Sequence, residues 1–135
     1  LPLPRFVSLG QDKVNARVGP GQNYPIAWVY SRRNLPVELV GEYELYRKIR
    51  DREGSESWVH KSQLQGKRYA LVEGGTRALR DAPDDKARIT VQAESGVQVR
   101  VLKCKDGWCQ VDVQGTKGFG PIGFFWGVYS GETVE

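Results

Sequence analysis

The stretches Asn15-Ala16-Arg17-Val18-Gly19-Pro20 and Ala78-Leu79-Arg80-Asp81-Ala82-Pro83 decide the fold, because the second repeats the first in outline. Arg17 aligns with Arg80 and Pro20 with Pro83, at an offset of 63 residues (80 − 17). Two more pairs of segments follow in the same order, residues 35–39 with 97–101 and residues 54–66 with 115–127. Ordered self-similarity of this period indicates a duplicated structural unit. We therefore predict two copies of one small unit.

Each copy reads as short strands joined by turns. Residues 13–18 are expected to form a strand that ends at Gly19-Pro20-Gly21, because this triplet cannot continue a hydrogen-bonded ladder. Apolar and polar residues alternate over residues 97–101, as they do in a half-buried strand. Further strands of the first copy are expected at residues 27–30, 35–39, 46–50 and 58–64. No stretch predicts a helix longer than a single turn, so the fold class is all-β.

Length and charge restrict the class of protein. The chain has 135 residues with 16 glycines and 7 prolines, which suits two barrels of about 60 residues each. Its net charge of +4 and pI of about 9.2 come from basic residues interspersed with acidic ones, a pattern that does not indicate a nucleic-acid partner. No stretch is long and apolar enough to span a bilayer. Because the chain contains no methionine, we expect a processed protein whose signal peptide has been removed.

The two cysteines lie in Cys104-Lys105-Asp106-Gly107-Trp108-Cys109. Asp-Gly is a preferred centre of a two-residue hairpin turn, and such a turn would set Cys104 opposite Cys109, within disulfide geometry. A zinc site is the alternative, but two cysteines and one distant histidine supply too few ligands. A disulfide would indicate an oxidising compartment. A regular ladder from this turn would pair Leu102 with Val111, so we also expect a bulge near residues 101–102.

The first copy resembles a known family. Its stretch Val14-Asn15-Ala16-Arg17-Val18-Gly19-Pro20-Gly21, followed by Asn23-Tyr24-Pro25, is similar to the opening signature of bacterial SH3-like domains. Residues 54–59 resemble the family's closing Gly-Trp-Val strand, although Ser57 replaces a glycine and Ala16 a larger aliphatic residue. The resemblance covers residues 6–66 and 69–128. It implies two tandem small SH3-like β-barrels packed together, with domains at residues 5–66 and 67–129.

Aromatic and basic side chains of the first copy are the candidate binding residues. Barrels of this size bury few large rings, so some rings must be exposed, and shallow aromatic grooves bind extended peptides. We expect Tyr24 and Tyr46 at the surface, whereas Trp28 and Trp58 are equally compatible with the core. Basic side chains would assist an anionic ligand. The predicted ligand-binding residues are Arg17, Tyr24, Trp28, Arg32, Arg33, Tyr46 and Trp58.

Other residues do not form patterns that indicate catalysis. His60 is the single histidine, and the chain holds no nucleophile elbow for it to serve, so we expect a surface strand residue. Asp84-Asp85 lies in turn-like sequence where carboxylates are solvated. We therefore expect no catalytic residues, no metal ion and no cofactor.

Two functional hypotheses follow. The resemblance implies a periplasmic or secreted, non-catalytic binding or targeting module that recognises peptidoglycan or a protein or peptide partner. The alternative is a structural assembly or homo-oligomerisation protein with no small ligand. The first copy keeps the family signature and is the better candidate for recognition, while the second, with its disulfide, suits a stabilising or docking role.

Overall fold

The computed structural model describes all 135 residues and divides into two units, unit 1 (Leu1–Lys67) and unit 2 (Arg68–Glu135). Each unit is a seven-stranded antiparallel sheet around its own core, with one 3₁₀ turn and no α-helix. Unit 1 contains β1 (Arg5–Leu9), β2 (Val14–Arg17), β3 (Ile26–Tyr30), β4 (Pro36–Tyr43), β5 (Tyr46–Arg50), β6 (Glu56–His60), η1 (Lys61–Gln63) and β7 (Leu64–Gln65). Unit 2 contains β8 (Tyr69–Val72), β9 (Arg77–Arg80), β10 (Ile89–Ala93), β11 (Gln98–Lys105), β12 (Trp108–Val113), β13 (Thr116–Pro121), η2 (Ile122–Phe124) and β14 (Phe125–Trp126).

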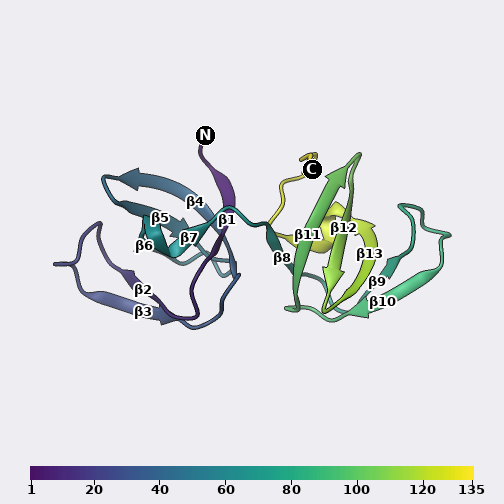
Figure 1. The fold of residues 1–135 in the computed structure, drawn as a ribbon, viewed down its shortest axis with the longest axis horizontal. Coiled ribbons are helices and arrows are strands. Elements are labelled where there is room, and N and C mark those ends of the chain that lie inside the picture. The colour runs from purple at the N-terminus through teal and green to yellow at the C-terminus, as the bar shows by residue number, and fades with distance from the viewer. The chain divides into compact units, whose positions relative to one another are not determined.

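The two sheets have the same topology. Their strand orders are β3-β2-β6-β5-β4-β1-β7 and β10-β9-β13-β12-β11-β8-β14, and every strand of the first sheet has its counterpart seven places later in the chain (Figure 1). The single pairing of Arg17 with Trp58 recurs as Arg80 with Phe119. The prediction of an all-β fold built from two copies of one small unit is confirmed.

Matching bulges bend the long strands of both units. The pairing of β4 with β5 shifts between Leu39 and Gly41, and that of β11 with β12 shifts between Val101 and Lys103. The bulge predicted at residues 101–102 is confirmed, and it lets Val101 face Val111 across the ladder. Each bulge adds one residue to its strand, which restores burial on the core side and increases local twist.

The strand β1 was not predicted, and its burial explains why. Residues 6–9 are buried one after another, without the alternation that marks a strand with one solvated face. This strand pairs with β4 and β7 on its two edges. Because successive side chains of a strand point to opposite faces, burial of residues 6–9 means that both faces of β1 are covered. Its counterpart β8 lies between β11 and β14 and buries residues 70–72 in the same way.

The two cores differ in side-chain size at two equivalent positions. Ala16 and Ser57 of unit 1 are replaced by Leu79 and Gly118 in unit 2, and all four positions are buried. A Cβ added at Gly118 would lie 2.6 Å from the Leu79 Cβ, so the larger leucine excludes any side chain at residue 118. Close-packed interiors tolerate exchanges that conserve the total buried volume. The smaller Ala16 of unit 1 therefore leaves room for the Ser57 side chain. The two departures from the family pattern thus compensate each other.

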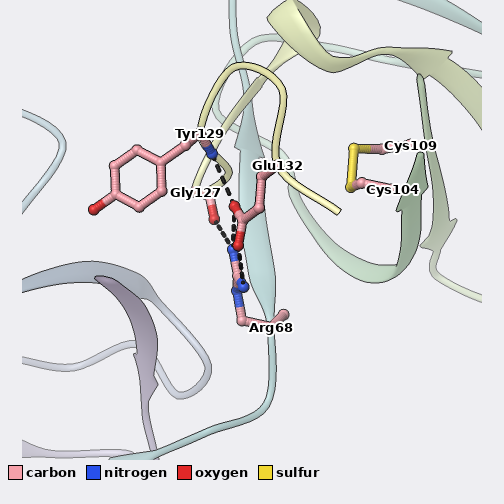
Figure 2. The surroundings of a disulfide bond; sticks show 6 residues. All are labelled: Arg68, Cys104, Cys109, Gly127, Tyr129 and Glu132. Carbon is pink, nitrogen blue, oxygen red and sulfur yellow. Dashed lines mark hydrogen bonds and ion pairs between the residues drawn. A yellow bond between two sulfur atoms is a disulfide. The ribbon is translucent and has the colours of Figure 1, made fainter. Parts of the chain in front are cut away.

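The predicted hairpin disulfide joins Cys104 to Cys109, which face each other across β11 and β12 (Figure 2). Asp106 and Gly107 both have positive φ, at 53° and 84°, as a type I′ turn requires. Both cysteines are fully buried. At the equivalent cross-strand pair of unit 1, Glu42 faces Arg47, and their side chains form an ion pair of 3.6 Å.

The C-terminal segment forms a strap over the disulfide-bearing strand. Val134 pairs with Cys104 through two backbone hydrogen bonds of 2.8 and 2.9 Å. Glu132 accepts two hydrogen bonds from the Arg68 guanidinium, at 2.8 and 3.0 Å, and one from the Tyr129 N–H (Figure 2). Burial alone would raise the pKa of the Glu132 carboxyl, but these hydrogen bonds outweigh it, so the pKa lies below its usual range. The strap is therefore held by a carboxylate that stays ionised.

Candidate functional site

A polar groove of about 490 Å³ lies between the outer face of β2 and the corner where β6 passes into η1. Val14 and Ala16 point into the core, so Asn15 and Arg17 project outward from β2 and form one wall with Lys13, which directly precedes the strand. The opposite wall comes from the end of β6 and from η1. The complete lining is Lys13, Asn15, Arg17, Gln22, Tyr46, His60, Ser62 and Gln63.

Arg17 joins the groove to the long loop at residues 18–25. Its Nη1 donates to the carbonyl oxygens of Gln22, at 3.2 Å, and Tyr24, at 2.9 Å. Arg80 makes the equivalent bond to the Ala87 carbonyl at 2.8 Å, so the arginine of the repeat holds the same loop in both units. The Tyr24 ring lies against the α-carbon of Gly19, where an added Cβ would come within 2.3 Å of it. Arg17 therefore shapes the groove as well as lining it.

Tyr46 and His60 form the floor of the groove. They pair across β5 and β6, and their rings meet edge to face with centroids 5.4 Å apart. The Ser62 N–H donates to His60 Nδ1 at 3.1 Å, and the Ser62 hydroxyl lies 2.8 Å from the same nitrogen. Since a nitrogen that accepts from a backbone N–H carries no proton, the neutral ring has its proton on Nε2. His60 thus caps η1, a role that its position in the sequence did not indicate.

The lining is rich in hydrogen-bond donors and positively charged. Lys13 and Arg17 supply two cations, amides and a hydroxyl supply neutral donors and acceptors, and no carboxylate is among the eight side chains. Such a surface favours a ligand with carboxylates and amide groups over an apolar one. No three His, Cys, Asp or Glu side chains lie together in an arrangement for a metal ion.

The structure places the seven predicted binding residues in different surroundings. Arg17 and Tyr46 line the groove, but Tyr46 is only 9% exposed, so the expectation that it lies at the surface is wrong for most of its ring. Tyr24 is 41% exposed on the loop that Arg17 holds. Trp58 projects from β6 on the outer face, beside Arg17 in the ladder.

The remaining predicted residues lie away from the groove. Trp28 packs against the core and meets the Tyr30 ring edge to face. The Tyr30 hydroxyl donates to Asp51 at 2.9 Å. Burial raises the pKa of Tyr30 to about 12, and the Asp51 carboxylate acts in the same direction. Arg32 is exposed in the turn after β3, and Arg33 is tied to Asp12 at 3.0 Å and to the Gly10 carbonyl.

The repeat and the fold agree with a comparison against protein families. The family model described as "Bacterial SH3 domain" matches residues 10–66 and matches again at residues 73–127. The chain belongs to this family. Units 1 and 2 are accordingly its first and second SH3 domains. A search of curated proteins gives no match.

Two matches among solved structures cover most of the chain. They are NlpC1 and NlpC2 from Trichomonas vaginalis, each 14% identical in sequence, with TM-scores of 0.41 and 0.42. The matches cover 93% of this chain but 46% and 49% of the two NlpC chains. This chain therefore spans about half the length of the proteins that it matches. No helix in the chain has the length and apolar character needed to cross a membrane.

The second SH3 domain does not reproduce the groove of the first. Asn15, His60 and Ser62 correspond to Ala78, Pro121 and Gly123, so the polar wall and floor are lost. The prediction did not include six of the eight lining residues, because a lone histidine and polar residues near strand ends look like ordinary surface. These six are Lys13, Asn15, Gln22, His60, Ser62 and Gln63. The one available signal was the contrast between Asn15, His60 and Ser62 and their apolar or small counterparts in the second copy.

Proposed function

We propose that the protein is a non-catalytic module of the cell envelope and that its first SH3 domain binds peptidoglycan through the polar groove. The observation that carries the proposal is the lining itself, which combines Lys13 and Arg17 with neutral amide, hydroxyl and imidazole groups and holds no carboxylate. The stem peptides of peptidoglycan present carboxylates and amides in an extended chain, and these groups complement such a lining.

Membership of the bacterial SH3 domain family and the disulfide both support an extracytoplasmic location. Disulfides persist in oxidising compartments such as the periplasm or the cell exterior. The non-catalytic assignment is supported by the groove lining, which places Ser62 beside His60 but holds no carboxylate to orient the imidazole as in a catalytic triad.

The test is co-sedimentation of the full chain with purified sacculi at physiological ionic strength. Lys13 is exposed, and reversing its charge leaves the loop contacts of Arg17 in place, so Lys13→Glu perturbs the groove without disturbing the fold. We expect this variant to bind about tenfold more weakly, equivalent to about 1.4 kcal/mol. Lys86→Glu is the matched control, because it makes the same charge change on an exposed loop of the second SH3 domain.

Three results would overturn the proposal. Equal losses in Lys13→Glu and Lys86→Glu would mean unspecific attraction of a basic protein to an anionic polymer. Unchanged binding in Lys13→Glu would place the ligand outside the groove. A wild-type chain that fails to sediment with sacculi but forms a stable dimer by light scattering would instead support an assembly protein.

A further inference from the structure

We propose that the second SH3 domain carries a separate binding site, on the outer face of β11, β12 and β13, for a proline-containing peptide segment with an acidic side chain. The site is a groove of about 520 Å³. Its apolar surface comes from Trp108, Phe119 and Pro83. Lys103, Lys105 and Asp106 provide its charge.

The strand alternation of β11 and β12 sends these side chains outward. Cys104 and Cys109 point into the core and are fully buried, so Lys103, Lys105 and Trp108 occupy the opposite face. Lys105 and Trp108 face each other next to the Asp106-Gly107 turn. The disulfide joins the two strands between these outward residues and fixes the spacing of the groove walls. A site with fixed walls loses less conformational entropy when it binds.

The chemistry of the groove selects the occupant. Two lysines and one aspartate leave a net positive charge, so an acidic side chain is favoured over a basic one. The Lys103 ammonium lies 5.6 Å from the centroid of the Phe119 ring, which holds this cation at the edge of the apolar surface. Aromatic grooves of this kind bind proline-rich segments, because such segments are already extended and lose little entropy on docking.

The first SH3 domain keeps the apolar surface at the equivalent positions but lacks the two lysines. Tyr46 and Trp58 stand where the second domain has Trp108 and Phe119. Gly41 and Tyr43 stand where it has Lys103 and Lys105. Lys48, the equivalent of Gln110, has its ammonium 3.2 Å from Glu56. The positive charge that selects an acidic side chain therefore belongs to the second domain alone, and the proposed site does not depend on what the first domain binds.

Heteronuclear NMR of the isotope-labelled full chain tests the proposal. The probes are the blocked peptide acetyl-Pro-Pro-Glu-Pro-Pro-amide and its matched counterpart with lysine in place of glutamate. We expect the acidic peptide to shift the Trp108 indole N–H and the amides of residues 103–110, and to leave residues 13–17 and 60–63 unchanged. The lysine peptide should bind about tenfold more weakly, which corresponds to the loss of one favourable charge contact.

Two variants separate binding from folding. Trp108→Ala should abolish the shifts, and the chemical shift of the Cys104 amide reports whether the hairpin remains folded. Lys103→Gln changes only an exposed side chain and should weaken the acidic peptide several-fold, while Lys86→Gln, outside the groove, should have no effect. The proposal fails if both peptides bind equally or if neither shifts the hairpin at millimolar concentration. It also fails if a trimer of N-acetylglucosamine gives the indole shift that the acidic peptide does not, since the groove would then bind a glycan.

Discussion

Reducing the Cys104–Cys109 disulfide should destabilise the second SH3 domain by about 2 kcal/mol and leave the first unchanged. The two domains form an internal comparison, because the same cross-strand position holds a covalent bond in one and the Glu42–Arg47 ion pair in the other. Reduction removes the covalent bond alone and leaves the turn and the ladder of β11 and β12 to hold the hairpin.

The magnitude follows from the size of the closed loop. The cysteines are five positions apart, so the bond closes a loop of six residues. The chain-entropy relation gives about 7 cal/mol/K for such a loop, or about 2 kcal/mol at 25 °C. Glu42 and Arg47 are partly exposed, so their ion pair contributes less than about 1 kcal/mol to the first domain. The difference between the stabilisation by the disulfide and that by the ion pair should therefore be measurable within one sample.

Hydrogen exchange followed by mass spectrometry is the assay, with alkylation to verify that both thiols are free. Amide protection in β11 and β12 should fall by about 30-fold on reduction, the equilibrium equivalent of 2 kcal/mol. Protection in β4 and β5 should not change. Equal protection of β11 and β12 in the oxidised and reduced chains would refute the loop-closure reasoning.

The double variant Glu42→Cys with Arg47→Cys is the matched control. Because the two hairpins have the same register, these cysteines face each other as Cys104 and Cys109 do, and they should oxidise spontaneously. The new bond should raise protection in β4 and β5 by an amount similar to the loss seen in the second domain. Failure to oxidise would contradict the structural equivalence of the two hairpins.

Three further predictions follow from individual contacts. Folding raises the pKa of Tyr30 to about 12 from the ordinary 10, so the unfolded chain loses this proton at lower pH than the folded one. The stability of the first domain should therefore fall between about pH 10 and pH 12. Urea unfolding across this range should show the fall in the wild-type chain and its absence in Tyr30→Phe. The lowered pKa of Glu132 means that its contribution to stability is present above the unfolded value of about 4.5 and is lost as the pH falls through the folded value. Glu132→Gln should also speed the reduction of the disulfide by dithiothreitol at neutral pH, because it releases the strap that pairs with Cys104; an unchanged rate would mean that the strap gives no protection. Gly118→Ser should cost about 1–3 kcal/mol and Leu79→Ala about 2–5 kcal/mol, but the two together should cost less than their sum, as measured by a double-mutant cycle.

Local rules made much of the fold predictable. The repeat of Arg17 as Arg80, the Asp106-Gly107 turn and the alternation of apolar residues are short-range signals, and each has the expected position in the structure. The disulfide could be predicted because the turn alone determines which residues face each other. The strand β1 could not, since burial on both faces removes the alternation on which the inference depends.

The candidate site was less predictable, because it depends on contacts between distant parts of the chain. The groove brings Lys13 and Asn15, at the start of β2, together with His60 and Ser62, which lie more than forty positions later in the sequence. The prediction favoured aromatic residues, but Trp28 is occupied in packing against the core. Only the register between the strands decides which polar side chains share a groove, and that register is a property of the folded sheet.

The most direct test of the central claim is a chemical-shift titration of the isotope-labelled full chain with a soluble muropeptide that carries a complete stem peptide. The claim is that the polar groove of the first SH3 domain recognises peptidoglycan. It predicts saturable shifts at the amides of residues 13–17 and 60–63, which weaken in Lys13→Glu and persist in Lys86→Glu. Saturable binding whose shifts fall only outside these residues, or no shift at millimolar concentration, would contradict it.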